Sequence, residues 1–267
     1  MKINNVSKLK PKKLIVFDLD GTLAESKTVM DHNMAELIAK LLQTKKVAVI
    51  GGGKYTLFKW QFLSALKKVP KNSLKNLFLF PTSGNAFYRY TSGWKNVYSH
   101  DLSKQEKTQI RSAFDHVFKK IDYKHPKKVY GVLLEDRKSQ MSFSPLGQEV
   151  ITVLGKRGLR MKEQWRSKYD HIRHKIAQLV AKELPNLEVR VGGITTIDIT
   201  MKGIDKAYGV RQMEKYLKVK VRDMLFVGDA IYPRGNDYAV LKTKIDYIKV
   251  KNPAHTAKVI KAILAKQ

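Results

Sequence analysis

The chain contains no cysteine, no long apolar run and few acidic residues. Without a Cys among its 267 residues it can form no disulfide and perform no thiol chemistry, which suits a reducing cytoplasm. No apolar run approaches the roughly 20 residues that a membrane-spanning helix needs. The apolar segment after the basic residues 1–13 is also too short for a signal peptide. We therefore expect a cytoplasmic protein with no membrane partner.

The shortage of acidic residues gives the chain a formal net charge of +29, from 52 Lys plus Arg against 23 Asp plus Glu. Such a field attracts phosphate-bearing substrates or binds nucleic acid without sequence preference. The basic residues are spread along the sequence, and there is no zinc-finger spacing, RNA-recognition aromatic signature or helix-turn-helix. We expect a generally basic surface and no specific nucleic-acid function.

The first third of the chain alternates between short apolar runs and amphipathic stretches. An apolar content of 43% is enough for sizeable cores. Strand-to-helix alternation is typical of a parallel sheet with helices on both faces, so the predicted fold class is α/β. The expected strands are 14–18, 46–50 and 77–80, and the expected helices are 34–42 and 55–66.

The most informative stretch is residues 14–23, Leu-Ile-Val-Phe-Asp-Leu-Asp-Gly-Thr-Leu. The apolar run predicts a buried strand that Gly21 ends. Because strand side chains alternate, Asp18 and Asp20 are expected to point the same way at the carboxyl end, where ligands bind in open α/β sheets. Two carboxylates held that close need a proton or a cation between them. One Asp can then be a nucleophile and the other an acid/base; the alternative is a helix-capping turn.

This stretch resembles the nucleophile motif Asp-x-Asp-Gly-Thr of the haloacid dehalogenase superfamily. The resemblance implies a Rossmann-like parallel sheet and a Mg²⁺ ion held by Asp18, the backbone carbonyl of Asp20, and Asp229. Asp229 follows the apolar run 224–227, and Asp237 would lie in the first or second layer of ligands. Oxygen ligands of this kind suit Mg²⁺.

Two further parts of the pattern concern phosphate binding. Lys206, which precedes a helical stretch, could neutralise Asp18 and the phosphoryl oxygens; a solvated Lys at a helix start is the alternative. After the strand 46–50 the superfamily places a Ser or Thr, but this chain has Gly51-Gly52-Gly53-Lys54. The amides of Gly52 and Gly53, with Lys54, can still cradle a phosphate. Losing one donor typically costs roughly 10- to 1000-fold in rate.

The pattern changes from about residue 91. Two helical stretches, 103–121 and 162–184, alternate with short strands, which describes an α+β domain inserted in the parallel core. We predict a first core part at 1–90, a cap domain at 91–200 and a second core part at 201–267.

The inserted segment resembles that of the eukaryotic-type phosphomannomutases, a capped branch of the superfamily. The motifs that carry the resemblance are Arg137 to Gly147, Gly192 to Asp198, Gly203-Ile204-Asp205-Lys206 and the 228–237 loop. In that family, cap arginines grip the distal phosphate of a sugar bisphosphate, because the planar guanidinium holds phosphate with two hydrogen bonds. The family pairs through its caps, so the resemblance implies a possible homodimer.

Carried over by position, the substrate-binding residues are only partly retained. The substrate-binding set implied by the resemblance is Lys27, Arg137, Gln148, Thr196 and Asp198. Gln148 and Lys27 stand where the family has Arg, and a third family Arg falls on Tyr130. Losing two such clamps, each worth roughly 1.5–3 kcal/mol, should weaken retention of a bisphosphate.

These departures favour hydrolysis. The predicted function is Mg²⁺-dependent phosphoryl transfer through an aspartyl-phosphate on Asp18, with Asp20 as acid/base and Lys206 as the balancing charge. The expected substrate is a sugar phosphate or similar phosphomonoester. One alternative is phosphomannomutase activity. Another is a non-catalytic, basic nucleic-acid-binding protein on the same scaffold.

Overall fold

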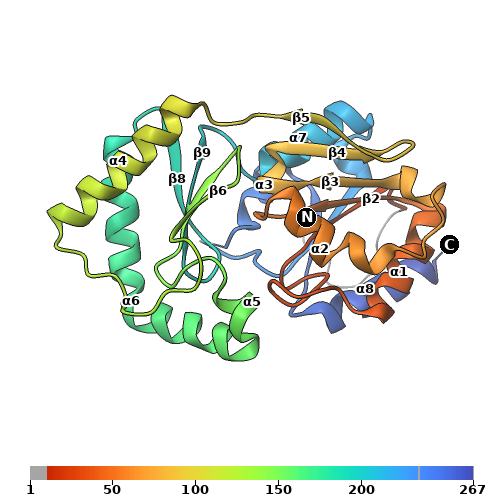
Figure 1. The fold of residues 1–267 in the computed structure, drawn as a ribbon. Helices are drawn as coiled ribbons and strands as arrows, with labels where there is room; N and C mark the ends of the chain where they lie inside the picture. Colours follow the sequence, from red (N-terminus) through yellow and green to blue (C-terminus); the bar gives the residue numbers. More distant parts are fainter. Residues whose placement is uncertain (1–10, 234, 267) are drawn as a thin grey trace. The chain divides into compact units, whose positions relative to one another are not determined.

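The computed structural model describes residues 11–233 and 235–266, which form two compact units. The first unit combines the chain up to Ser99 with the segment from Asp205 onward, and the second comprises His100–Ile204. The second unit is therefore an insertion in the first. Figure 1 shows the helices and strands of each unit.

The first unit is built on a seven-stranded sheet with the strand order β11-β10-β1-β2-β3-β4-β5. Neighbouring strands from β11 to β3 are parallel, whereas β4 and β5 add an antiparallel hairpin at the edge. The strands are β1 (Leu14–Asp18), β2 (Lys46–Ile50), β3 (Leu77–Phe80), β4 (Ala86–Tyr90), β5 (Trp94–Ser99), β10 (Met224–Gly228) and β11 (Asp246–Lys249).

Alternate side chains of β1 enter two separate cores. Ile15 and Phe17 pack in one hydrophobic cluster with residues of α1 and α8, and Leu14 and Val16 pack in another with residues of α7. A strand buried on both faces explains why residues 14–17 are all apolar. The helices are α1 (His32–Thr44), α2 (Tyr55–Gln61), α3 (Pro81–Gly84), α7 (Lys206–Leu217) and α8 (Pro253–Leu264), with 3₁₀ turns at Leu63–Leu66, Ser73–Asn76, Val221–Asp223 and Tyr238–Thr243. The predicted α/β class is confirmed.

The second unit packs helices on an antiparallel sheet of strand order β6-β7-β9-β8. Its core joins apolar residues of α4 and α6 to the inner face of the sheet. A capping box at Ser103 and Glu106 begins α4, because each side chain bonds the other residue's backbone N–H. The elements are α4 (Lys104–Lys120), β6 (Leu134–Asp136), β7 (Met141–Phe143), α5 (Val150–Leu154), α6 (Lys156–Glu183), β8 (Leu187–Gly192) and β9 (Thr196–Met201).

Several boundaries differ from the sequence-based expectation. The inserted unit ends at Ile204 and not at residue 200. The first unit continues to Ser99 and not to residue 90, because the β4–β5 hairpin extends its sheet. Helix α6 begins at Lys156 and not at residue 162. Glycine is a weak helix former, so Gly158 made a helix start at this position look unfavourable in the sequence. In the structure, a Cβ on Gly158 would lie 2.2 Å from the carbonyl oxygen of Val150. Close packing of α5 on α6 requires this glycine.

No helix in the described ranges 11–233 and 235–266 is long and apolar enough to cross a membrane.

Candidate active site

The candidate site lies where the chain connections leave the central sheet in opposite directions. Asp18 is the last residue of β1, and Asp229 directly follows β10, the parallel neighbour of β1. The chain continues from β1 to β2 on the other side, so β1 marks the point where the strand order reverses. Open α/β sheets bind ligands at the carboxyl ends of the strands at this point.

A buried ammonium group joins two carboxylates at the centre of the site. Lys206 Nζ donates to Asp18 Oδ1 at 2.5 Å and also to Asp237 Oδ1. All three residues are buried, and Lys206 is only 2% exposed. Burial excludes the alternative that Lys206 is a solvated residue at a helix start. A buried charge of this kind is tolerated only when it is paired.

Two glycines allow the acidic side chains to approach this centre. A Cβ on Gly21, whose φ of +82° itself favours glycine, would lie 2.6 Å from Asp229 Oδ2. A Cβ on Gly228 would lie 2.4 Å from Asp237 Oδ2. The backbone N–H of Ala230 donates to that same oxygen at 3.1 Å. Carboxylate oxygens of Asp18, Asp229 and Asp237 consequently lie within 4.8 Å of one another.

This crowding shifts the ionisation of the cluster. Burial raises the pKa of Asp18 well above its usual range; Lys206 opposes the shift, whereas Asp237 and Asp229 add to it. Burial, followed by the charge of Asp237, also raises the pKa of Asp229. Burial by itself would lower the pKa of Lys206, but Asp18 and Asp237 outweigh it and raise that pKa. Lys206 is therefore protonated at neutral pH, and the three carboxylates favour a further cation.

Helix α7 positions Lys206 because it begins directly against another segment of the same unit. Asp205 caps the helix by accepting from the backbone N–H of Tyr208 at 2.8 Å. Gly84 (φ +89°) touches Gly209 so closely that a Cβ on Gly84 would lie 2.5 Å from the Gly209 Cα. The first turn of α7 therefore packs against the turn that contains Gly84, which fixes the origin of the Lys206 side chain.

The glycine-rich loop after β2 is held by that same turn. The backbone N–H groups of Thr82 and Ser83 donate to the carbonyls of Gly53 and Gly51 at 3.0 and 2.8 Å. Both donor residues have left-handed backbones, with φ of 49° and 59°, which is costly for residues other than glycine. A Cβ on Gly52 would meet nothing within 4 Å. Open space beside Gly52 leaves room for a ligand at the carboxyl end of β2.

The carboxylate of Asp20 has partners of its own. Strand β1 ends at Asp18, so side-chain alternation does not continue to Asp20. Asp20 Oδ1 accepts 2.8 Å hydrogen bonds from the backbone N–H of Lys27 and from Gln61 Nε2. The carboxylates gathered around Asp18 are those of Asp229 and Asp237, and the Asp20 side chain is outside that triad.

Gln61 is a site residue that the sequence analysis missed. It ends α2 and is fully buried, and its Nε2 also donates to the Glu25 carbonyl at 3.3 Å. Its Oε1 has no hydrogen-bond partner among the described residues. The available signal was a glutamine between Phe58 and Phe62, on a helix face that must be buried, because a buried amide needs polar partners.

The acidic triad is suited to a divalent cation. Asp18 Oδ2 is buried and has no hydrogen-bond partner in the described part of the chain. Oxygen ligands alone, several of them carboxylates, match the preference of Mg²⁺ over softer metals. The residues present therefore fit such an ion.

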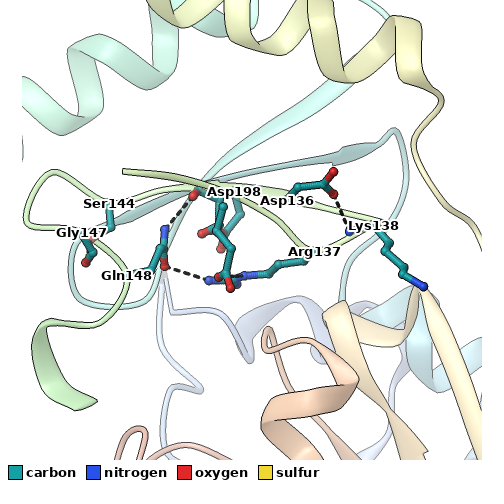
Figure 2. A network of polar contacts seen from close by, with 9 residues as sticks. Asp136, Arg137, Lys138, Ser144, Gly147, Gln148 and Asp198 are labelled. Atoms are coloured by element: carbon teal, nitrogen blue, oxygen red, sulfur yellow. Dashed lines mark hydrogen bonds and ion pairs between the residues drawn. The ribbon is translucent and has the colours of Figure 1, made fainter. Parts of the chain in front are cut away.

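Three of the residues predicted to bind substrate in the second unit, Arg137, Gln148 and Asp198, form a network on its sheet (Figure 2). Arg137 Nε donates to Glu135 at 2.8 Å, and its Nη2 donates to Gln148 Oε1 at 3.1 Å. Gln148 Nε2 donates to the carbonyl of Ser142 at 2.6 Å, and the Ser142 hydroxyl donates to Asp198 Oδ1 at 2.5 Å. The structure thus joins Arg137, Gln148 and Asp198 through Ser142, which the sequence analysis missed.

The remaining predicted residues lie outside this network. Thr196 begins β9, two residues before Asp198. The backbone N–H of Lys27 donates to Asp20 Oδ1. Lys54 is exposed and precedes α2 without capping it through its side chain. Tyr130 pairs through its backbone with Leu146 and Glu149, beside Gln148.

Comparisons with known proteins agree with this geometry. Residues 34–266 match the eukaryotic phosphomannomutase family. The chain is 28% identical to the phosphomannomutase of Encephalitozoon cuniculi, over 96% of this chain and 94% of that one. It is 26% identical to the Saccharomyces cerevisiae phosphomannomutase, over 95% and 94% of the two chains.

Solved structures share the fold at lower sequence identity. The IMP-bound IMP-nucleotidase of Plasmodium falciparum superimposes with a TM-score of 0.70 at 16% identity, covering 97% of this chain and 70% of that one. A haloacid dehalogenase-like hydrolase from Bacteroides thetaiotaomicron gives 0.61 at 15% identity, covering 94% and 99%.

A parallel sheet with a reversed strand order, an aspartate at the end of β1 and a lysine-bridged acidic cluster define a haloacid dehalogenase-like enzyme of phosphoryl transfer, either a phosphatase or a mutase. Within that class, the chain belongs to the eukaryotic phosphomannomutase family.

Proposed function

We propose that this enzyme hydrolyses a small phosphomonoester, most simply a sugar phosphate, through a phosphoryl group carried by Asp18. The observation that supports the proposal is the buried Asp18 carboxylate, which has one oxygen on Lys206 and the other without a hydrogen-bond partner among the described residues. A nucleophile needs a free oxygen, and its burial keeps water from competing for the phosphorus.

The acidic triad would hold Mg²⁺ through Asp18, Asp229 and Asp237, with the backbone carbonyl of Asp20 as a further ligand. When bound, this ion would neutralise charge on the phosphoryl oxygens. The chain's own cation, Lys206, contributes in the same direction because it stays protonated beside Asp18. The amides of Gly52 and Gly53 would bind the remaining oxygens.

Asp18 attacks phosphorus, and the bond from phosphorus to the ester oxygen breaks. Asp20, as the general acid, gives a proton to the leaving oxygen. In the second half, Asp20 takes a proton from water, whose oxygen attacks phosphorus and releases phosphate from Asp18. The Lys27 N–H and the Gln61 amide fix the Asp20 carboxylate during both proton transfers.

Hydrolysis is favoured over mutase chemistry by the second unit. A mutase must retain a sugar bisphosphate through its turnover, and family arginines serve that purpose. Gln148 occupies one of those positions. Its amide accepts a hydrogen bond from Arg137 and donates one to the Ser142 carbonyl. An amide offers phosphate neither the charge nor the planar fork of a guanidinium. We infer that this unit acts as a cap that recognises the sugar through Arg137, Thr196 and Asp198.

Phosphomannomutase activity is the second candidate, and family membership favours it. The matches extend over nearly the whole chain, including the second unit. The two candidates differ in their products: hydrolysis gives inorganic phosphate, whereas the mutase converts mannose 6-phosphate to mannose 1-phosphate and needs a bisphosphate activator.

A product assay on a panel of sugar phosphates tests the proposal. We expect phosphate release that falls at least about 100-fold after chelation with EDTA and returns with added Mg²⁺. Formation of mannose 1-phosphate is followed in parallel, with and without a hexose bisphosphate. Isomerisation without phosphate release would show that the enzyme is a phosphomannomutase and not a phosphatase. Turnover that is unchanged by EDTA would contradict the metal site.

Replacing Gln61 by Leu should slow the reaction without unfolding the protein. Leu has a similar volume but cannot donate to Asp20, so the carboxylate loses one of the two hydrogen bonds to its Oδ1. We expect kcat to fall roughly 10- to 100-fold with little change in KM, because proton transfer by a positioned group contributes about 10²–10⁴-fold. Gln43→Leu, on the exposed side of α1, is the matched control. Equal kcat for the two variants would remove Gln61 from the mechanism.

A further inference from the structure

Helix α6 of the second unit carries an unusual density of positive charge. Its 28 residues include nine Lys or Arg and three Asp or Glu. Several of the basic residues recur at intervals of three or four, together with exposed neutral residues at the same spacing. The row, which we name the α6 stripe, is Arg157, Arg160, Gln164, Lys168, His171, Lys175, Gln178 and Lys182, and all eight residues are exposed.

The spacing places the α6 stripe along one side of the helix, because residues three and four apart are neighbours on a helix surface. The other side is occupied: Trp165, Ile176 and Val180 are buried. Arg173 shows what a structural basic residue on α6 does. It is buried, pairs with Asp170 and donates to the carbonyls of Gly192 and Ile194.

The α6 stripe has no such internal role. In the described residues, none of its five Lys and Arg side chains forms an ion pair, although Lys168 lies 5.2 Å from the centre of the Tyr169 ring. The acidic residues of α6 lie outside the stripe, and two of them have partners: Asp170 binds Arg173 and His174, and Glu183 binds His116. Charges left uncompensated repel one another and give the folded protein no stability.

The side chains and shape of the α6 stripe exclude three kinds of anionic partner. A single strand is gripped largely by stacking its bases on aromatic side chains, and the stripe contains no Phe, Tyr or Trp. A membrane-binding helix inserts an exposed apolar face, whereas the apolar side of α6 is buried in its own unit. A small phosphate ester requires a concave pocket, and the stripe is the outside of a helix.

A nucleic-acid duplex matches the length and the charge of the α6 stripe. From Arg157 to Lys182 the helix path is about 38 Å at 1.5 Å per residue, and B-form DNA presents one phosphate per about 1.7 Å of its axis. Lys and Arg are the side chains that contact phosphates and set position without reading sequence. We propose that the α6 stripe binds the phosphate backbone of a nucleic-acid duplex without sequence preference.

The salt dependence of binding tests the proposal in the full-length protein. Five phosphate contacts predict a slope of about −4.5 for log affinity against log salt, so raising NaCl from about 50 to about 200 mM should weaken binding about 500-fold. Fluorescence anisotropy with a labelled DNA duplex of arbitrary sequence measures this slope. A second duplex of unrelated sequence should give the same affinity.

A matched pair of variants separates the α6 stripe from the overall charge. The stripe variant is Arg157→Gln, Arg160→Gln, Lys168→Gln, Lys175→Gln and Lys182→Gln; the control is Lys40→Gln, Lys67→Gln, Lys71→Gln, Lys258→Gln and Lys261→Gln, all exposed residues of the first unit. Both lose five charges. We expect the stripe variant to lose at least about 100-fold in affinity at low salt and most of its slope, while the control keeps both within a few-fold.

Circular dichroism and phosphate release establish that both variants are folded, since none of the ten residues belongs to the site around Asp18. Equal losses in the two variants would assign binding to net charge and overturn the proposal. Tighter binding of a single strand of the same length would also overturn it, as would equal binding to vesicles rich in phosphatidylserine. Absence of duplex binding by the unmodified protein at low salt would do the same.

Discussion

Replacing Asp18 by Asn should abolish phosphate release, with a loss of about 10⁴-fold or more. Asn has nearly the same shape, but its amide cannot attack phosphorus and so cannot carry the phosphoryl group. The measurement is release of phosphate over long incubations at high enzyme concentration, with the metal added. A covalent nucleophile produces losses of this size, whereas removal of one charge-stabilising donor gives about 10²- to 10³-fold.

Two further variants make this result specific. Asp18→Glu keeps the charge and lengthens the side chain, so it should also be inactive if the position of the oxygen matters. Asp115→Asn removes a carboxylate from the exposed side of α4 and should leave activity unchanged. If Asp18→Asn retained more than about a hundredth of the activity, with the protein shown to be free of deamidation by mass spectrometry, Asp18 would not be the nucleophile.

Replacing Lys206 by Met should affect both stability and rate. Lys206 is the shared partner of Asp18 and Asp237, and its removal leaves two buried carboxylates without their cation. Breaking a buried pair in this way typically costs about 3–5 kcal/mol, which for a protein of this size lowers the melting temperature by about 10 °C. Loss of its charge from the reacting centre should reduce kcat by a further 10²- to 10³-fold, approximately.

Thermal unfolding with and without Mg²⁺ is the informative measurement for Lys206→Met. A divalent cation should stabilise the variant more than the unmodified enzyme, because it supplies charge that the variant lacks. Lys215→Met, on the exposed side of the same helix, is the control and should change neither property. If Lys206→Met melted at the same temperature as the unmodified enzyme, Lys206 would not be the cation that stabilises the buried carboxylates of Asp18 and Asp237.

Local sequence patterns predicted much of the fold. The strands 14–18, 46–50 and 77–80 were placed at their observed limits, because each is a short apolar run ended by a change in composition. The 103–121 helix was also predicted within one residue of its observed limits, Lys104–Lys120. These features depend on residues close together in the chain.

Patterns that depend on tertiary packing were missed. The α5–α6 contact makes a buried glycine at position 158 compatible with a helix, and nothing within that segment signals it. Strand β5 was placed in the predicted insertion because its residues are mixed in polarity, as an edge of a sheet allows. Gln61 is recognisable as a site residue only when Asp20 is seen at its amide.

The sequence by itself determined which residues of the candidate site exist and their order: Asp18, Asp20, Lys206, Asp229 and Asp237, each next to a strand or helix end that can be recognised locally. Only the tertiary structure decided their partnerships. It bridges Asp18 to Asp237 through Lys206 and places the Gln61 amide on the carboxylate of Asp20. The physical reason is that charge pairing and burial depend on distances between residues far apart in the chain, which local periodicity does not specify.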